Sequence, residues 1–281
     1  MAPRLVVVAG GGTMGAGIAH AFAAAGSSVV VLEADSSRAE AAMERIRATL
    51  GKAEERGKLP ALAAEVAARV RASTVDIPGD ASLYVEAVPE DAALKKDVLR
   101  RLESAAGADA VVATNTSSLS VTDLAAALAR PERFCGMHFF NPVPASALVE
   151  LVRHPGSADE VLEQAREWVA ALGKESILVA DSPGFATSRL GVAVGLEAIR
   201  MVQDGVASAE DIDTGMRLGY RWPVGPLRLG DLVGLDVRLG IAEHLAATLG
   251  PRFDPPALLR EMVARGDLGT KSGRGFYNWP A

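Results

Sequence analysis

A histidine and a glutamate twelve positions apart are the side chains of this sequence best suited to moving a proton. They bound the stretch HFFNPVPASALVE, which runs from His138 to Glu150. If the chain turns at NPVPA, two strands lie side by side and bring the carboxylate next to the imidazole. Such a carboxylate fixes the imidazole tautomer and stabilises the protonated ring. The pair could then accept the proton that a hydroxyl group loses on oxidation. The alternative is a core histidine and an unrelated carboxylate at a strand edge.

A glycine-rich turn near the N-terminus could hold the hydride acceptor for such an oxidation. The stretch GGGTMG follows an apolar run and precedes a helical pattern, the context in which G-x-G-x-x-G binds a dinucleotide pyrophosphate. Glu33 ends the next apolar run, at the spacing expected for a carboxylate that binds a ribose 2′-hydroxyl. Residues 34–37 contain no cation for a 2′-phosphate, so NAD is favoured over NADP. A structural turn beside a solvated glutamate is the alternative. The predicted motif residues are Gly10, Gly12, Thr13, Met14 and Gly15.

A polar cluster follows another apolar run, residues 110–114. Ligands of parallel sheets bind at the carboxyl ends of the strands, so we expect Asn115 and Ser117 near the nicotinamide ribose or a substrate oxygen. These residues could instead cap the helix that begins near Val121. Ser120 or Thr122 could provide that cap without them.

The elements that must position these residues read as an α/β sheet domain. Residues 5–9, the glycine turn, a helix ended by Gly26 and residues 28–33 form a βαβ unit, which predicts a parallel sheet. Residues 36–70 are predicted to form two helices, a hairpin interrupted near Gly57 and Pro60. The predicted strands are residues 5–9, 28–33, 82–88, 110–114, 134–140, 148–152 and 176–180.

A further helix is predicted around residues 94–102. Leu94, Val98 and Leu102 recur every fourth residue, and charged residues, among them Lys95, occupy the other faces. This pattern is typical of a helix on the protein surface, with Lys95 in solvent.

The pattern changes at residues 181–184. Beyond them no strand-like run stands out and helical periodicity dominates, with Ser208 and Asp211 placed as an N-cap and an acidic first turn. We therefore predict a domain of residues 1–182 followed by an all-helical domain of residues 183–281. So small a helical domain buries little apolar surface alone, which favours dimerisation through it.

The bulk properties exclude several classes of protein. The chain has 281 residues and a net charge of −6, so neither nucleic acid nor an acidic membrane surface is an expected partner. A single cysteine, Cys135, permits no disulfide within the chain, which suits a cytoplasmic location; an inert, buried thiol is expected. Residues 5–32 carry no charged side chain, but their glycines interrupt any signal peptide or membrane helix. No metal site is predicted.

Several stretches together resemble the L-3-hydroxyacyl-CoA dehydrogenases, in particular the bacterial 3-hydroxybutyryl-CoA dehydrogenases. The similarity covers essentially the whole chain, in order and at matching spacing. The stretches are VVVAGGGTMGAGIA, VEAVPEDAALK, TNTSSLS, GMHFFNPVP with LVELV, DSPGF and GTKSGRGFYNW. The resemblance implies a Rossmann-like, mostly parallel sheet domain with an inserted helical hairpin, then a helical dimerisation domain. It also implies NAD-dependent interconversion of an (S)-3-hydroxyacyl-CoA and a 3-ketoacyl-CoA.

The resemblance assigns roles to individual residues. His138 would be the general acid/base and Glu150 its orienting carboxylate, while Ser117 would contact the substrate oxygen and the nicotinamide ribose. Gly10, Gly12 and Gly15 would hold the pyrophosphate and Glu33 the adenosine ribose. Glu90 and Lys95 match positions near the nicotinamide, and Asn141 matches a residue that contacts the cofactor. Without the resemblance, Glu90 and Lys95 read as a helix N-cap region and a solvated helix face.

One departure from the family pattern concerns the catalytic residues. Many members read P-G-F-x-x-N-R where this chain reads PGFATSR, so Ser188 stands in place of a catalytic asparagine. Serine lacks the amide and its reach. Ser188 could bond the thioester or the 3-oxygen directly or through water, Ser117 could carry the role alone, or activity could be reduced.

Three alternatives remain at the level of sequence. The substrate could be a thioester of an acyl carrier protein in place of CoA. The chain could also be a non-catalytic NAD-binding relative, which Ser188 favours mildly and the His138–Glu150 pair disfavours. A dehydrogenase of a small free β-hydroxyacid would use a lysine base, and no motif places a lysine where His138 stands.

Overall fold

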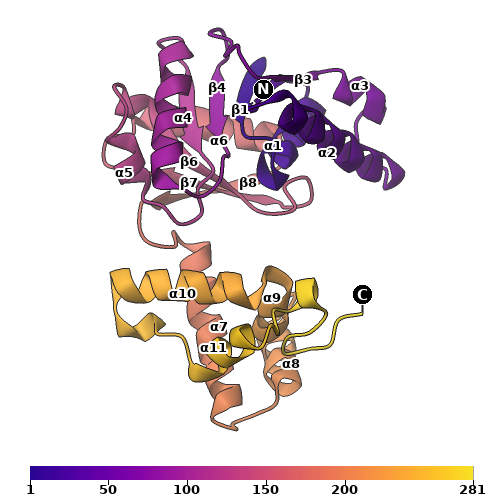
Figure 1. The fold of residues 1–281 in the computed structure, drawn as a ribbon, viewed down its shortest axis with the longest axis vertical. Helices are drawn as coiled ribbons and strands as arrows, with labels where there is room; N and C mark the ends of the chain where they lie inside the picture. The colour runs from indigo at the N-terminus through magenta and orange to yellow at the C-terminus, as the bar shows by residue number, and fades with distance from the viewer. Residues whose placement is uncertain (281) are drawn as a thin grey trace. The chain divides into compact units, whose positions relative to one another are not determined.

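The computed structural model describes residues 1–280, and the chain divides into two compact units. The first unit is Met1–Asp181, and the second begins at Ser182 (Figure 1). The first contains the sheet and its covering helices, and the second is built from helices.

The first unit is built on one eight-stranded sheet with the order β3-β2-β1-β4-β5-β6-β7-β8. Neighbouring strands are parallel except β6 and β7, which are antiparallel. The central strands are valine-rich and buried on both faces, as expected for a sheet covered on two sides. The predicted mostly parallel α/β fold is confirmed. The strands are β1 (Leu5–Ala9), β2 (Ser28–Leu32), β3 (Val70–Ser73), β4 (Leu83–Glu86), β5 (Val111–Thr114), β6 (Phe134–Phe139), β7 (Leu148–Arg153) and β8 (Glu175–Ala180).

Local signals account for where the helices of this unit begin and end. Asp35 caps α2 by accepting from Arg38 N, and Gly26 follows α1 with a φ of +100°. Ser120 caps α5 by accepting from Asp123 N, so the cap does not need Asn115 or Ser117. Helices α2 and α3 pack on each other as the predicted hairpin. The helices are α1 (Thr13–Ala24), α2 (Ser36–Glu55), α3 (Ala63–Ala67), α4 (Ala92–Ala105), α5 (Val121–Ala125) and α6 (Asp159–Ala171).

Two predictions about this unit were wrong. Val70, expected to end a helix, begins the edge strand β3, which was not predicted and in which Val70 pairs with Val29. The strand is short and only Val70 is a large apolar residue, so its sequence carries little strand signal. On α4, Lys95 is buried and Leu94 is 40% exposed, the reverse of the predicted faces. A buried carboxylate partner explains the inversion, as described below.

The second unit is all-helical over the described residues, as predicted. Its core includes Leu196, Leu235 and Leu245, and Ser208 caps α8 by accepting from Asp211 N. The buried carboxylate of Asp231 binds backbone and indole N–H groups of the C-terminal segment 276–279. The helices are α7 (Thr187–Gln203), α8 (Ala209–Gly219), α9 (Pro226–Val233), α10 (Leu235–Leu249) and α11 (Ala257–Ala264). Across residues 1–280, no helix combines the length and the apolar character needed to cross a bilayer.

Candidate active site

The histidine and the glutamate face each other across the antiparallel pair β6–β7. In the register of these strands His138 lies directly opposite Glu150, and imidazole Nδ1 lies 2.7 Å from Glu150 Oε2. The glutamate side chain is fully buried and the histidine side chain is 9% exposed. A short contact between a buried carboxylate and an imidazole is a charge-assisted hydrogen bond whenever the ring is protonated. The arrangement favours the tautomer with a proton on Nδ1.

The imidazole borders a cavity that is lined by half of the predicted site residues. The ring packs against Phe140 in a tilted arrangement, with the centroids 4.5 Å apart and an interplanar angle of 49°. Because Nδ1 is committed to Glu150, proton exchange with a ligand in the cavity would use Nε2. The cavity has a volume of about 350 Å³ and is lined by Met14, Ala87, Val88, Glu90, Lys95, Asn115, Ser117, His138, Phe139, Phe140 and Asn141.

Asn115 and Glu90 hold the backbone around this cavity. Asn115 Oδ1 accepts from Phe139 N at 2.9 Å, which ties the loop after β5 to the end of β6. Glu90 Oε1 accepts from Thr116 Oγ1 at 2.6 Å and from Ser118 Oγ at 2.8 Å. Burial opposes ionisation of Glu90, but these hydroxyl donors and the Lys95 charge together hold the pKa of its carboxyl below the usual value. Glu90 is therefore an anion, and its hydrogen bonds hold residues 116–118 in place.

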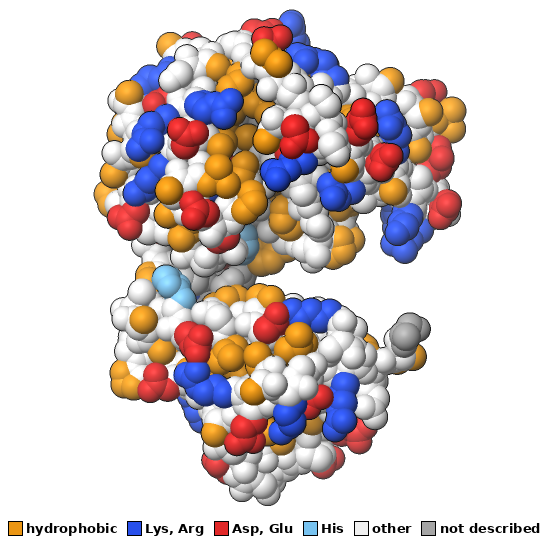
Figure 2. Space-filling model, in the orientation of Figure 1, with side chains coloured by type: hydrophobic (Ala, Val, Ile, Leu, Met, Phe, Trp, Pro, Cys, Tyr) orange, Lys and Arg blue, Asp and Glu red, His pale blue; other side chains and the backbone are white. Residues whose placement is uncertain are grey.

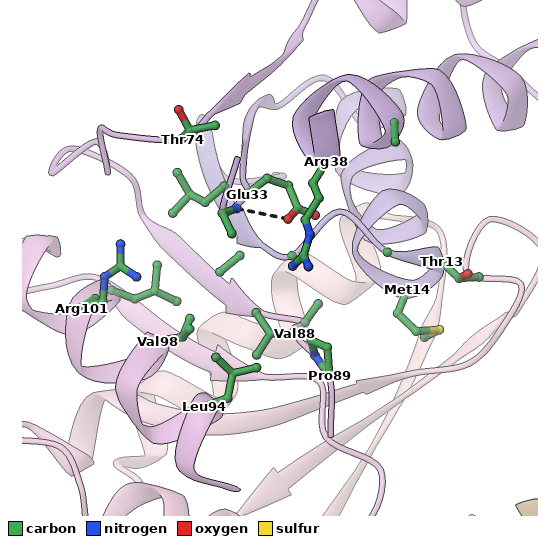
Figure 3. Close-up of a pocket in the computed structure, with 18 of the residues that line it drawn as sticks. Thr13, Met14, Glu33, Arg38, Thr74, Val88, Pro89, Leu94, Val98 and Arg101 are labelled. Carbon is green, nitrogen blue, oxygen red and sulfur yellow. Dashed lines mark hydrogen bonds between the residues drawn. The ribbon is translucent and has the colours of Figure 1, made fainter. Parts of the chain in front are cut away.

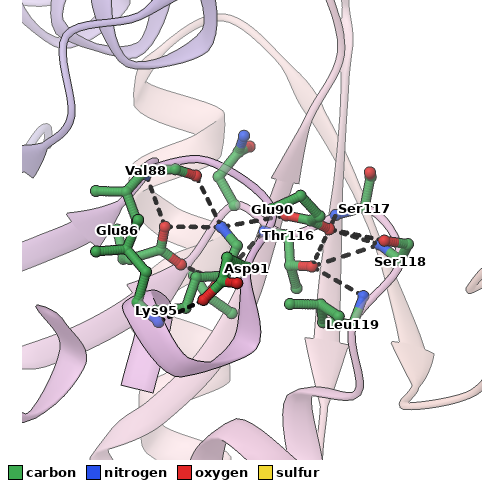
Figure 4. Close-up of polar contacts among 12 residues, drawn as sticks. Glu86, Val88, Glu90, Asp91, Lys95, Thr116, Ser117, Ser118 and Leu119 are labelled. Atoms are coloured by element: carbon green, nitrogen blue, oxygen red, sulfur yellow. Dashed lines mark hydrogen bonds and ion pairs between the residues drawn. The ribbon is translucent and has the colours of Figure 1, made fainter. Parts of the chain in front are cut away.

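Lys95 is buried because its ammonium group has carboxylate partners on two sides (Figure 4). Its Nζ lies 2.7 Å from Glu86 Oε1 and 3.2 Å from Glu90 Oε2, and it donates to Val88 O at 3.1 Å. Its side chain is only 2% exposed. The interpretation of Lys95 as a solvated lysine on a helix face is therefore wrong.

The glycine turn has the geometry of a phosphate cradle. Gly10 has a φ of +96°, and an added Cβ there would lie 2.7 Å from Ala87 O. A Cβ on Gly15 would lie 1.7 Å from Gly10 O, so only glycine lets α1 approach the turn. Gly12 faces open space and precedes α1 without any side-chain cap bond, which leaves backbone N–H groups of the first turn directed at a ligand. These features fit a dinucleotide pyrophosphate.

A second, larger cavity of about 740 Å³ extends from this turn. It shares Met14, Ala87 and Val88 with the histidine cavity, so the two cavities are adjacent. Leu94 and Val98 of α4 line it, which explains why these leucine and valine side chains face away from the core. On the face drawn in Figure 2, a band of apolar side chains runs between α4 and α2 with charged groups on both sides. The combined space suits a long, mostly flat ligand with charged phosphates.

Glu33 stands at the wall of the larger cavity. Its Oε1 accepts from Gly11 N at 2.5 Å, so the carboxylate is anchored to the glycine turn. Figure 3 shows Glu33 together with Arg38 and Arg101 around this cavity. Arg38 and Arg45 of α2 and Arg101 of α4 also line this cavity. Residues 34–37 contain no cation, but α2 places two arginines from further along the chain, Arg38 and Arg45, at the cavity. Helical spacing from Glu33 could have revealed Arg38 and Arg45.

Not every predicted residue belongs to this constellation. Ser188 lies in the first turn of α7, in the second unit, and its role stays a prediction. Glu86 and Thr114 were missed, although a glutamate inside the apolar strand β4 is itself a signal. Cys135 is buried, and burial raises the pKa of its thiol to about 12, so it is no nucleophile.

Known proteins similar to this chain agree on one family. Residues 5–182 match the 3-hydroxyacyl-CoA dehydrogenase NAD binding domain and residues 184–279 match the 3-hydroxyacyl-CoA dehydrogenase C-terminal domain. The chain is 41% identical to the 3-hydroxybutyryl-CoA dehydrogenase of Mycobacterium tuberculosis over 98% of both chains. It is 38% identical to the human mitochondrial hydroxyacyl-coenzyme A dehydrogenase, over 98% of this chain and 90% of that protein. The crystal structure of (S)-3-hydroxybutyryl-CoA dehydrogenase from Ralstonia eutropha superposes with a TM-score of 0.93, at 39% identity and over the full length of both chains.

Proposed function

Since the chain belongs to the 3-hydroxyacyl-CoA dehydrogenase family, a family of NAD-dependent oxidoreductases, we propose that His138 and Glu150 carry its acid/base chemistry. The reaction is the interconversion of an (S)-3-hydroxyacyl-CoA, such as 3-hydroxybutyryl-CoA, and the 3-ketoacyl-CoA. The observation that carries the proposal is the 2.7 Å His138–Glu150 contact, at the wall of a cavity adjacent to the one that the glycine turn lines.

Gly10, Gly12 and the first turn of α1 would hold the pyrophosphate of NAD, and Glu33 would bind the adenosine ribose. Bound in this way, NAD supplies a nicotinamide that accepts or returns a hydride. Asn115, Ser117, Glu90, Lys95 and Asn141 line the cavity at the His138 end, which supports placing the nicotinamide side there. Thr13 and Met14 extend the cradle between these two ends.

In the oxidative direction, neutral His138 removes the C3 hydroxyl proton through Nε2 while the hydride leaves C3. Ser117, at the cavity wall, donates to the same oxygen and holds it in place. The buried carboxylate of Glu150 stabilises the imidazolium that forms. The sum of charges in the site stays constant, because the imidazole gains the positive charge that the nicotinamide loses. A low-dielectric site can therefore complete the transfer without a change in its net charge.

The remaining roles are assigned on weaker grounds. Residues 1–182 would form the NAD-binding domain and residues 183–281 the substrate and dimerisation domain. Exposed large apolar side chains in the second unit, for example Leu218 at 73% and Tyr220 at 75%, support a homodimer through it. Ser188 would donate to the substrate thioester or 3-oxygen, directly or through water.

The other readings fit the site less well. A non-catalytic NAD-binding relative would have no use for a buried carboxylate that orients a cavity-lining imidazole. A base in a free-acid dehydrogenase would be a lysine, but Lys95 is held by two carboxylates. A carrier-protein thioester would meet the same acid/base pair, so the distinction between it and CoA lies in the substrate assay.

The test is oxidation of NADH by purified protein with acetoacetyl-CoA, compared with longer 3-ketoacyl-CoA homologues, an acetoacetyl carrier-protein thioester and NADPH. We expect turnover with acetoacetyl-CoA and NADH. The variant His138→Gln should lose about 10²–10⁴-fold in kcat while its NADH affinity changes little. An inactive wild type that still binds NADH would establish the non-catalytic reading, and an active His138→Gln variant would remove His138 from the mechanism.

A further inference from the structure

Three buried or half-buried charges lie together beside the His138 cavity, and their sum is negative. Lys95 contributes one positive charge, and Glu86 and Glu90 contribute two negative ones (Figure 4). We propose that Glu86 sets this net charge of −1 and so makes the site bind oxidised nicotinamide in preference to reduced nicotinamide. The inference rests on the proposed function, because it places the nicotinamide in the cavity that Lys95 and Glu90 line.

The contacts of Glu86 are those of an ionised carboxylate. Oε1 accepts from Lys95 Nζ at 2.7 Å and from Val88 N at 2.7 Å, and Oε2 accepts from Thr114 Oγ1 at 2.6 Å. Three donors thus point at its two oxygens. The neutral acid would carry a proton on one of these oxygens, where it would face another donor, so the geometry suits the carboxylate. Glu86 is fully buried, so water does not screen this charge.

Lys95 and Glu90 alone would be a neutral ion pair. Glu90 is fixed as an anion by Thr116, Ser118 and Lys95, as described above. The ammonium lies 2.7 Å from Glu86 and 3.2 Å from Glu90, so the two carboxylates share its single positive charge. The carboxylate of Glu90, which lines the cavity, is left with incomplete compensation. Glu86 does not line the cavity and is a positioning residue that acts through Lys95.

The oxidised ring carries a positive charge and the reduced ring is neutral, whereas the rest of the cofactor is identical. A net negative group therefore favours the oxidised form and leaves the shared contacts unaffected. A unit charge roughly 8–10 Å away at an effective dielectric constant near 20–40 changes a binding ratio on the order of tenfold. Glu150 adds a further negative charge while His138 is neutral, so the proposal concerns the share that Glu86 contributes.

A purely structural role for Glu86 has a different signature. The carboxylate links the loop after β4, through Val88, to the end of β5, through Thr114. If it only held these segments in place, its loss would weaken the binding of NAD⁺ and NADH by the same factor. The ratio of the two dissociation constants separates the alternatives, because it cancels every contact common to both nucleotides.

The experiment measures the dissociation constants of NAD⁺ and NADH by isothermal titration calorimetry on the full-length protein. In Glu86→Gln we expect the ratio Kd(NAD⁺)/Kd(NADH) to rise on the order of tenfold over that of the wild type. Glu86→Asp keeps the charge and should keep the ratio within about threefold, even if both affinities fall. The matched control is Glu103→Gln, because Glu103 is also buried, accepts from Ala129 N and Arg130 N, and lines neither of the two cavities.

An unchanged ratio in Glu86→Gln overturns the proposal, as does an equal shift in Glu103→Gln. If Glu86→Gln does not fold, Glu90→Gln replaces it. The Glu90 side chain is 37% exposed, so its substitution should disturb folding less, and the substitution removes the same unit of negative charge. The ratio must then rise in the same direction, or the proposal fails. The proposed function is refuted by a different result, the absence of NADH oxidation by the wild type. If the wild type is active and the ratio Kd(NAD⁺)/Kd(NADH) is unchanged in the variant, only the charge inference is refuted.

Discussion

Replacing Glu150 by glutamine removes one charge from the site and leaves the shape of the side chain almost unchanged. The carboxylate is fully buried and its Oε2 lies 2.7 Å from His138 Nδ1. An amide oxygen can still accept from Nδ1 and hold the ring in place. Because the position is fully buried, water cannot solvate the imidazolium in place of the missing carboxylate. The variant therefore separates orientation of the imidazole from stabilisation of imidazolium.

The magnitude follows from the contact. Opposite charges centred roughly 4 Å apart at an effective dielectric constant of about 20 interact with about 4 kcal/mol. If the proton is about half transferred in the transition state, about 2 kcal/mol of this is lost there, which is on the order of 30-fold in rate. Complete transfer would set an upper limit on the order of 10³-fold. We expect Glu150→Gln to lower kcat by a factor within this range.

The assay is steady-state oxidation of NADH by acetoacetyl-CoA, with NADH affinity and thermal unfolding measured on the same samples. NADH affinity should change little, because Glu150 does not line either cavity. Glu103→Gln again serves as the control, a buried carboxylate removed elsewhere in the first unit. A kcat within threefold of the wild type in a folded Glu150→Gln would show that the carboxylate does not stabilise imidazolium, and the role given to it here would be wrong.

Three further predictions concern other parts of the chain. Glu33→Ser removes the carboxylate that repels a 2′-phosphate and leaves the arginines of the cavity, so the ratio of kcat/KM for NADPH to that for NADH should rise at least about tenfold in coupled rate assays. Burial and the nearby Lys174 lower the pKa of His20 to about 4 from 6.5, so the unfolded chain takes up a proton that the folded one refuses between these values. Stability should therefore fall as pH drops through this window, and His20→Gln should reduce the pH dependence of urea unfolding by up to one proton. Asp231→Ala leaves buried donors such as the Trp279 indole without an acceptor, which should destabilise the protein by about 3 kcal/mol or more and lower its melting temperature in calorimetry.

The sequence was sufficient where a local rule decides the structure. In β6 and β7 the residue numbers of every pair have the same sum, as those of His138 and Glu150 do, so the register is constant along the pair. The turn sets this register and the apolar pattern reinforces it. The glycine turn was equally legible, since the positive φ of Gly10 and the close approach at Gly15 leave room for no other residue.

The sequence was insufficient where a side chain meets its partner on a different element of the fold. A helical pattern places a lysine in solvent by default, because an isolated buried ammonium is unfavourable. Lys95 is an exception because Glu86, on the neighbouring strand β4, supplies a buried countercharge. The place of Arg38 and Arg45 at the cavity beside Glu33 was not predicted for a similar reason, because α2 returns residues five and twelve positions beyond Glu33 to that cavity. Short edge strands such as β3 have too few side chains to show a pattern at all.

Topology explains why residues so dispersed in sequence meet in one place. The order β1-β4-β5-β6 aligns the carboxyl ends of four parallel strands, from which Gly10, Glu90, Ser117 and His138 extend in turn. A fifth parallel strand could not have supplied Glu150, because the crossover to it needs a dozen or more residues and usually a helix. Only eight residues separate Phe139 from Leu148, so the chain must reverse and run antiparallel. The one antiparallel pair in the sheet is thus what brings a carboxylate to the imidazole.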